Sequence, residues 1–230
     1  MSQNKPLRGA LAGASAVLAL GLGACSAMTG ESMQSSSSSQ VRDAAGQTQA
    51  EVAKLSPKEE FELYGQRYEH ANKYLEQAQR ALDAGEWEWT SNGLIPPGGG
   101  EGLAGATMEN SYSLSMSRAI QRGNAYPDET VTKGLEEFFT KQGWRIGHDH
   151  VASDINLAGF TDDGYTIEYV FRDNGRISVE ARSPTYWTND SMELADAIYS
   201  RFKVDRRNQS KPGERIAFPR WEGPAARSTS

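Results

Sequence analysis

The longest regular alternation of apolar and polar positions predicts an amphipathic helix in the first half of the chain. Ser56 and Glu59 are spaced as a capping box, Pro57 occupies the first helical position, and Gly85 is a suitable C-terminal stop. Between them, small or apolar residues recur at steps of three and four, which places them on one helix face. These residues are Phe61, Tyr64, Tyr68, Ala71, Leu75, Ala78 and Leu82.

The same spacing would also fit the seam of a coiled-coil dimer. Such a seam favours branched aliphatic side chains, whereas this stripe contains Tyr64, Tyr68, Ala71 and Ala78. We therefore expect the helix to pack on a sheet of its own chain, and the protein to be a monomer.

The second half of the chain carries strand patterns separated by turn signals. Residues 165–171 and 176–182 alternate apolar and polar side chains, and Asp173-Asn174-Gly175 between them predicts a tight hairpin. Further strands are predicted around residues 87–89, 112–116, 144–151 and 155–160, and helices over 127–142 and 190–202. Strands joined by tight turns are antiparallel, so the pattern predicts an α+β fold: a two-layer sandwich of a mainly antiparallel sheet and about three helices.

The N-terminus has a different pattern, in which Lys5 and Arg8 precede an apolar run from Ala10 to Ala24. A bilayer-spanning helix needs roughly 20 apolar residues, so this shorter run indicates a secretory signal peptide over residues 1–24. The run ends at Cys25, the single cysteine of the chain, so the exported domain has no disulfide available.

The sequence Leu22-Gly23-Ala24-Cys25 resembles the lipobox of bacterial lipoproteins. That resemblance implies cleavage before Cys25, attachment of diacylglycerol to its thiol, and acylation of the new amine. Two or more acyl chains hold a protein stably on a membrane, because each buried methylene contributes about 0.8 kcal/mol. We expect the protein on the outer face of the cell membrane. The competing interpretation is an ordinary secreted protein in which Cys25 is incidental.

Composition divides the rest of the chain into a polar segment, a folded domain and a polar tail. Residues 25–55 include the serine run Ser35–Ser39 and predict a disordered tether. Residues 56–204 are long enough to bury a core and predict the α+β domain. Residues 205–230 predict a mostly disordered tail, with Ile216–Phe218 as a candidate edge strand.

Net charge excludes one class of partner. The whole chain carries −6, and removal of residues 1–24 lowers the basic residues from 24 to 22 while the acidic ones stay at 30, which gives −8. That balance argues against nucleic acid as a partner, because nucleic-acid binding requires clustered positive charge. It also argues against electrostatic adhesion to anionic lipid, so the acyl groups must provide the membrane attachment.

The domain also resembles the small mycobacterial lipoproteins of the LppA type. The residues that carry this resemblance are Trp87-Glu88-Trp89, Glu136-Glu137-Phe138 and Gly164-Tyr165-Thr166-Ile167-Glu168. The C-terminal half departs from that family where its members carry cysteines. The resemblance implies a mixed α/β fold and brings no functional residues with it.

His148 and His150 form the sharpest candidate for metal chemistry. Residues two apart on a strand face the same way, so both imidazoles could bind one metal ion. A zinc site needs a third ligand and usually a fourth, and His70, Asp154, Asp162 and Asp163 are the candidates. The competing interpretation is a pair of solvent-facing histidines on an edge strand.

Trp87, Trp89, Tyr186 and Trp187 are candidates for a platform that stacks on sugar rings of a cell wall. Large aromatic side chains also dominate ordinary cores, so burial is the competing interpretation. The glycine-rich stretch Pro96–Gly102 lacks the Lys-Ser/Thr pair of a phosphate-binding loop and predicts a connector.

The chain has no G-x-S-x-G motif, and its single cysteine is assigned to lipid, so no nucleophile stands out for catalysis. We expect a non-catalytic binding or scaffold module without a cofactor, whose partner is an envelope protein or a cell-wall glycan. The alternative is a cell-wall-directed or metal-dependent hydrolase that uses the region of His148 and His150.

Overall fold

A computed structural model of the chain describes residues 41–96, 98–100, 102–122, 127, 129–201 and 208–222, all within one compact unit, residues 34–230. The predicted signal peptide, the serine run and Cys25 lie outside the described residues.

The described part of the chain contains the three predicted helices, a short additional helix before them, and nine strands. The helices are α1 (Gln49–Val52), α2 (Pro57–Leu82), α3 (Glu129–Gln142) and α4 (Ser191–Tyr199). The strands are β1 (Trp87–Asn92), β2 (Ser111–Tyr112), β3 (Ser115–Gln121), β4 (Arg145–Val151), β5 (Asp154–Phe160), β6 (Thr166–Phe171), β7 (Arg176–Arg182), β8 (Tyr186–Trp187) and β9 (Gln209–Ser210).

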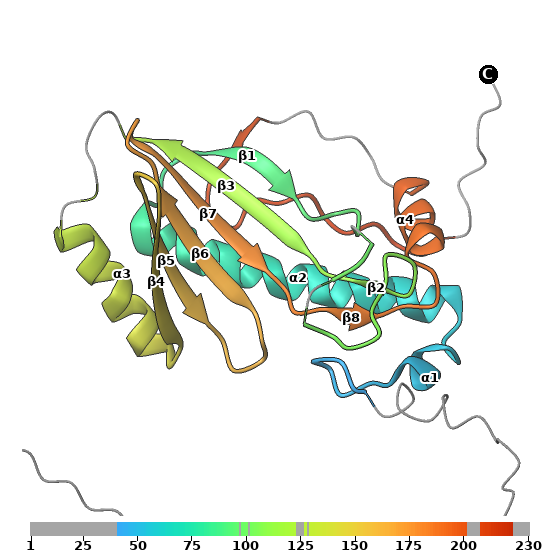
Figure 1. Ribbon diagram of the computed structural model, residues 1–230. Helices are drawn as coiled ribbons and strands as arrows, with labels where there is room; N and C mark the ends of the chain where they lie inside the picture. Colours follow the sequence, from blue (N-terminus) through green and yellow to red (C-terminus); the bar gives the residue numbers. More distant parts are fainter. Residues whose placement is uncertain are drawn as a thin grey trace, which may run out of the picture. The chain divides into compact units, whose positions relative to one another are not determined.

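Seven strands form one antiparallel sheet in the order β4-β5-β6-β7-β3-β1-β9, and β2 pairs with β8 in a separate ribbon. Helix α2 runs along one face of the sheet, and α3 lies beside β4 and β5 (Figure 1). The architecture confirms the predicted α+β sandwich of antiparallel sheet and helices.

Helix α2 begins with the predicted capping box. The Ser56 amide donates to a Glu59 carboxylate oxygen at 2.7 Å, and the Glu59 amide donates to the Ser56 hydroxyl at 3.3 Å. The predicted apolar stripe is buried except for Leu82, which is partly exposed, and Tyr64, Ala71 and Ala78 are all 0% exposed. The helix ends at Leu82, because Asp83 adopts an extended conformation two residues before Gly85.

The sheet buries the face that it turns toward α2. On β6, Ile167, Tyr169 and Phe171 are each 0% exposed, and the residues between them are partly exposed. The Tyr169 hydroxyl donates to the Ala78 carbonyl at 2.7 Å and so ties the sheet to the helix. This alternation is the period-two pattern of a sheet with one covered face. Helix α2 therefore packs on the sheet of its own chain.

Helix α3 covers the β4–β5 end of the sheet through close contact with a glycine. A Cβ atom at Gly159 would lie 2.7 Å from the Phe139 ring, so this strand position accommodates the ring only because it lacks a side chain. Phe139 also packs on Tyr169, with ring centroids 5.9 Å apart.

The folded part begins earlier than the predicted boundary at Ser56. The Trp187 amide donates to the Asp43 carboxylate at 3.3 Å, and Val52 of α1 is 1% exposed. Residues 41–55 therefore belong to the domain and not to the tether. Thr48 and Glu51 form a second capping box, which gives this short segment its own local structure.

The folded part also extends beyond residue 204. Strand β9 pairs with β1 at the sheet edge, and Ile216 is 8% exposed. The predicted edge strand Ile216–Phe218 is irregular in structure, although its side chains pack on α2. The described part of the predicted tail, residues 208–222, is thus part of the domain.

Candidate functional site

The two histidines of the predicted metal site lie on β4 and are exposed. His148 Nε2 lies 3.4 Å from a carboxylate oxygen of Glu136, which belongs to helix α3. Within the residues that the structure describes, no three His, Cys, Asp or Glu side chains are grouped so as to hold a metal ion. His70 and Asp163 pair with each other instead. The structure therefore does not assemble the predicted site at His148 and His150.

Of the four aromatic residues proposed for a stacking platform, three are buried, which is the competing interpretation. Trp87 is 0%, Trp187 2% and Tyr186 5% exposed, and only Trp89 is partly accessible. Trp89 is itself covered by the Arg118 guanidinium, 4.1 Å from the ring centroid. Three of the four rings belong to the interior, because the buried surface of large aromatic side chains stabilises a core strongly. They do not form a surface that could stack on sugars.

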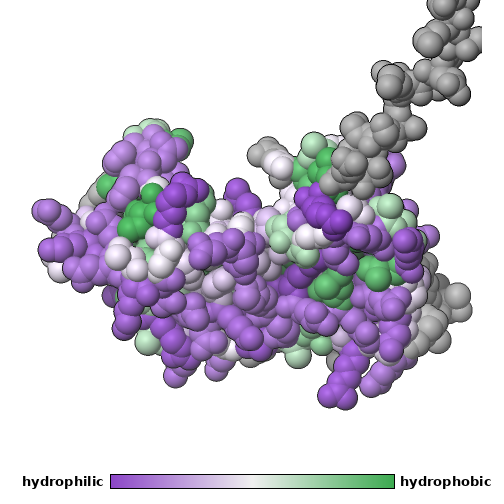
Figure 2. Space-filling model, turned by 90° about the horizontal axis from the view of Figure 1, so that it is seen from below, coloured by the Kyte–Doolittle hydropathy of each residue, from purple (hydrophilic) through white to green (hydrophobic). Residues whose placement is uncertain are grey.

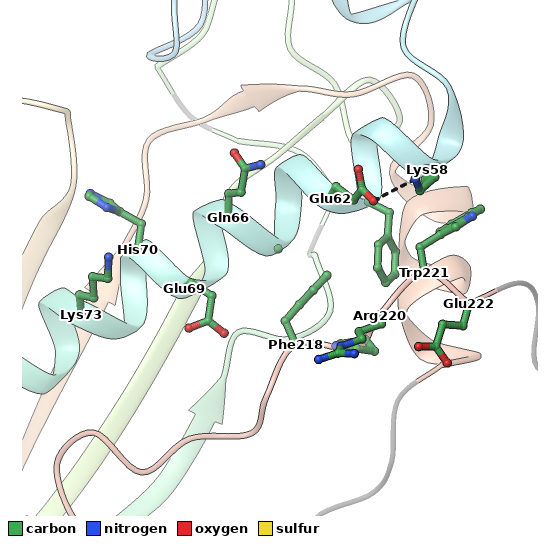
Figure 3. Close-up of a pocket in the computed structure, with 13 residues that line it drawn as sticks. Lys58, Glu62, Gln66, Glu69, His70, Lys73, Phe218, Arg220, Trp221 and Glu222 are labelled. Atoms are coloured by element: carbon green, nitrogen blue, oxygen red, sulfur yellow. Dashed lines mark ion pairs between the residues drawn. The ribbon is translucent and has the colours of Figure 1, made fainter.

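The structure instead presents a groove along one side of α2, which we call the α2 groove (Figure 3). Its volume is about 870 Å³. One wall is α2, and the other is a C-terminal segment, residues 211–222, which we call the strap. The lining residues are Lys58, Phe61, Glu62, Gly65, Gln66, Glu69, His70, Lys73, Phe218, Pro219, Arg220, Trp221 and Glu222.

Aromatic side chains line the groove where the strap meets α2. The Phe61 ring centroid lies 4.9 Å from that of Phe218 and 5.2 Å from that of Trp221. Gly65 allows this approach, since a Cβ atom there would lie 2.6 Å from Phe218 Cδ1. The Arg201 guanidinium covers Trp221 at 4.0 Å. An apolar floor of this kind can bury the apolar part of a ligand.

Polar contacts fasten the strap to α2 on one side of this aromatic cluster, toward the C-terminal end of the helix. The Tyr68 hydroxyl donates to the Ile216 carbonyl at 2.8 Å, and Arg215 Nε donates to a Glu69 carboxylate oxygen at 2.7 Å. Arg80 donates to the Pro212 carbonyl at 3.0 Å. The second wall of the groove is therefore built into the fold, although it comes from a segment that the sequence predicts as a tail.

Both signs of charge line the rim of the groove. Lys58 pairs with Glu62 one turn later on α2, at 3.4 Å. Lys73, Arg220 and Glu222 form no ion pair with another described residue. A ligand that carries charges of both signs could pair with groups of this kind.

One end of the groove is bounded by a cluster around Asp163, in the turn between β5 and β6. His70 Nε2 lies 2.7 Å from Asp163 Oδ2, the Tyr74 hydroxyl donates to Asp163 at 3.0 Å, and the Thr161 hydroxyl donates at 2.5 Å. Burial opposes the charged carboxylate, but the hydrogen bonds from Thr161, His70 and Tyr74 outweigh it and lower the pKa of Asp163. Burial and the Asp163 carboxylate raise the pKa of Tyr74 to about 12.

This cluster fastens the β5–β6 turn to α2. Its two hydroxyl groups, on Tyr74 and Thr161, donate to Asp163 and not to His70. A histidine general base would need a nucleophile hydroxyl within hydrogen-bonding reach of its own ring. The His70–Asp163 pair therefore joins α2 to the β5–β6 turn at one end of the groove.

The sequence pattern identifies only half of this site. The α2 wall follows from the helical periodicity, which leaves Lys58, Glu62, Gln66 and Lys73 on the polar side. The strap wall was missed because its apolar residues, Ile216, Phe218 and Trp221, are separated by prolines and charges. Three large apolar residues within an otherwise polar tail were the signal that this segment packs on the domain.

Among the described helices, none combines the length and apolar character that a membrane-spanning segment needs. No protein-family model matches the chain, and comparisons with curated proteins and with solved structures gave no match.

Proposed function

We propose that this chain is a lipid-anchored, extracytoplasmic binding protein without catalytic activity, which binds a short extended peptide of an envelope protein in the α2 groove. One observation carries the proposal: an 870 Å³ groove with an aromatic floor and a rim of both charge signs. Ligand sites are typically clefts of about 300–1,000 Å³ with an apolar lining and a few polar groups that set orientation.

The dimensions of the α2 groove suit an extended peptide. Lys58 and Lys73 mark its two ends on α2, and a helix rise of about 1.5 Å per residue separates them by about 22 Å. An extended chain rises about 3.3 Å per residue, so about seven residues would fill this length. Aromatic side chains of such a peptide would contact the aromatic floor of the groove, and its charged side chains would contact the rim.

The groove also has the rigidity that a binding site needs. Three hydrogen bonds and the Phe61–Phe218 contact hold the strap on α2, so little ordering is required when a ligand binds. A preorganised site loses less conformational entropy on binding and therefore binds more tightly.

The proposed anchor would place this domain close to the membrane. Residues 26–40 separate Cys25 from the first described residue. A disordered tether of this length, as the sequence predicts, would have a mean span of roughly 20 Å. The lipid supplies attachment, and the groove supplies recognition.

The experiment compares two tryptophan substitutions on exposed glutamines of the same helix. Gln66 lines the groove and Gln77 does not, so Gln66→Trp fills the site while Gln77→Trp is the matched control. A heptapeptide library displayed on phage is selected on the immobilised full chain, and the recovered peptide is synthesised and titrated by fluorescence anisotropy.

We expect Gln66→Trp to weaken peptide binding at least tenfold and Gln77→Trp to change it less than twofold. Equal affinity for the two variants would contradict the groove as the site. A chitotetraose titration forms the second arm: if the oligosaccharide binds in a Gln66-dependent way and the peptide does not, the ligand is a glycan and the peptide proposal fails.

A further inference from the structure

Helix α4 exposes large apolar side chains on its outer face. Met192 is 69% and Tyr199 67% exposed. The two residues are seven apart, which is two helical turns, so they lie on the same side of α4. The opposite side is anchored in the core by Leu194 and Ile198, which are 4% and 0% exposed.

A third exposed apolar residue lies on the loop that contacts the start of α4. Met108 is 70% exposed, and its carbonyl accepts a hydrogen bond from the Ser191 hydroxyl at 2.6 Å at the start of α4. The Ser191 amide donates to the Glu109 carbonyl at 2.8 Å, so the loop before β2 lies directly against the helix N-terminus. We call Met108, Met192 and Tyr199 the methionine surface.

The backbone beneath the methionine surface is held firmly. The Asp190 carboxylate accepts hydrogen bonds from the Met192 and Glu193 amides and caps α4. A Cβ atom at Gly98 would lie 2.1 Å from the Met108 carbonyl oxygen, so the glycine-rich connector packs closely on this loop. Met108 also lines a hollow of about 580 Å³ together with Arg182. The surface therefore combines a fixed backbone with adaptable side chains.

Acidic residues lie within and beside the methionine surface, because Asp196 is four residues after Met192 and three before Tyr199 on α4. Glu109, Glu193 and Asp196 are exposed and form no ion pair with another described residue. The sequence of α4 contains no lysine or arginine. Figure 2 shows that hydrophilic residues dominate one face of the domain and that hydrophobic residues gather there only in small areas.

These charges distinguish between three possible partners of the methionine surface: anionic lipid, a second copy of this chain, and a basic helix. Anionic lipid headgroups would be repelled by the three carboxylates, and a second copy of this chain would present the same negative charge. A helix with lysines or arginines beside an apolar stripe would satisfy both features. Methionine side chains suit such a partner, because they are flexible and adapt to different apolar shapes.

We propose that the methionine surface is a docking site for a basic amphipathic helix of another protein. The methionines and Tyr199 receive the apolar face of that helix, and Glu109, Glu193 and Asp196 pair with its basic residues. This site lies on α4 and the loop before β2, shares no residue with the α2 groove, and does not depend on what that groove binds.

The test uses the full chain and two designed probes of eighteen residues. One probe is an amphipathic helix of leucine and lysine, and the other has glutamate in place of every lysine. Binding is measured by fluorescence anisotropy in low and high salt. We expect the lysine probe to bind, the glutamate probe to bind at least tenfold more weakly, and high salt to weaken the lysine probe.

Substitutions on α4 test whether the lysine probe binds at the methionine surface. Glu193→Lys with Asp196→Lys should weaken the lysine probe at least tenfold, and Met192→Ser should weaken it severalfold. The matched control reverses two exposed acids of α3, Glu129→Lys with Glu137→Lys, and should change binding less than twofold. An equal loss in the control would show attraction by net charge alone and would overturn the proposal.

Two further measurements test the other occupants. If Met192→Ser abolishes sedimentation with phosphatidylglycerol vesicles while the lysine probe does not bind, the surface contacts lipid and the proposal is wrong. If the wild type is a dimer by light scattering and Met192→Ser is a monomer, a second copy occupies the surface and the proposal is again wrong. Near-UV circular dichroism confirms that each variant keeps the native fold.

Discussion

The Phe218 ring lies directly over Gly65, so that a Cβ atom at position 65 would come within 2.6 Å of its Cδ1 atom. These two residues are far apart in sequence, and their contact closes the aromatic floor of the α2 groove. A glycine in a helix interior costs about 0.5–1 kcal/mol relative to alanine. The close approach of the strap explains why this helix accommodates one.

Gly65→Ala should destabilise the domain, because the new methyl group collides with the Phe218 ring. Overpacking of this kind costs about 1–3 kcal/mol, which exceeds the gain in helix propensity. Gly134→Ala is the control: a Cβ atom there meets nothing within 4 Å, so the change should stabilise α3 by about 0.5–1 kcal/mol. Urea unfolding of both variants measures the two opposite effects.

A double variant separates the collision from other effects of Gly65→Ala. In the background of Phe218→Ala the ring is absent, so Gly65→Ala should no longer destabilise. A loss of stability that persists in the double variant would show that the strap contact is not its cause.

The N-terminal segment should depend on the buried pair of Arg67 and Asp43. Their closest nitrogen and oxygen atoms are 3.9 Å apart, and the two side chains are 7% and 0% exposed. Arg67→Met leaves the Asp43 carboxylate buried without its cation, and such a loss costs about 3–5 kcal/mol. Amide hydrogen exchange should show lost protection over residues 41–52.

Arg42→Met provides the matched control for this prediction. Arg42 pairs with Glu51 at 3.1 Å, but their side chains are 58% and 48% exposed. Exposed pairs contribute about 0–1 kcal/mol, so exchange over the same residues should change little. Equal loss of protection in both variants would contradict the role of the buried pair.

Acid should weaken the contact between the β5–β6 turn and α2. The pKa of Asp163 is lower in the folded protein than its ordinary value of 3.8. The carboxylate therefore stabilises the fold above its unfolded pKa, and this contribution disappears as pH falls through the lower folded pKa. Asp163→Asn should cost about 1 kcal/mol at pH 7, since solvent screens this partly exposed group.

The cost of Asp163→Asn should shrink at pH 2–3, below the ordinary carboxyl pKa of 3.8, because acid removes the contribution of the charged form. Asp162→Asn, at the exposed neighbouring position, should be nearly neutral at both pH values. Urea unfolding of the three proteins at each pH measures the differences. A cost of Asp163→Asn that is the same at pH 7 and at pH 2–3 would exclude the charged carboxylate as the cause.

Cys25→Ser should release the protein from membranes into the extracytoplasmic soluble fraction, because serine has no thiol to receive diacylglycerol. Fractionation measures the release, and mass spectrometry of the wild-type protein should find the acylated Cys25 at the new N-terminus. An unmodified Cys25 in the mature wild-type protein would disprove the lipid anchor while leaving the α2 groove proposal testable by peptide binding.

Local patterns in the sequence were sufficient for the elements that local interactions define. The capping box of Ser56 and Glu59 and the hairpin at Asp173-Asn174-Gly175 depend on residues within a few positions of each other. Helical and strand periodicities likewise identified α2, β6 and β7 almost to the residue, because they report which face of one element is apolar.

Only the tertiary structure decided which distant segments complete the domain and its candidate sites. The Asp43 carboxylate meets the Trp187 amide, and Phe218 meets Gly65, across most of the chain. Neither contact leaves a periodic signal, since each depends on one side chain reaching a surface built by other elements. For the same reason, Trp87, Tyr186 and Trp187 could not be assigned to core or surface from their residue types: burial depends on what the fold places over a side chain.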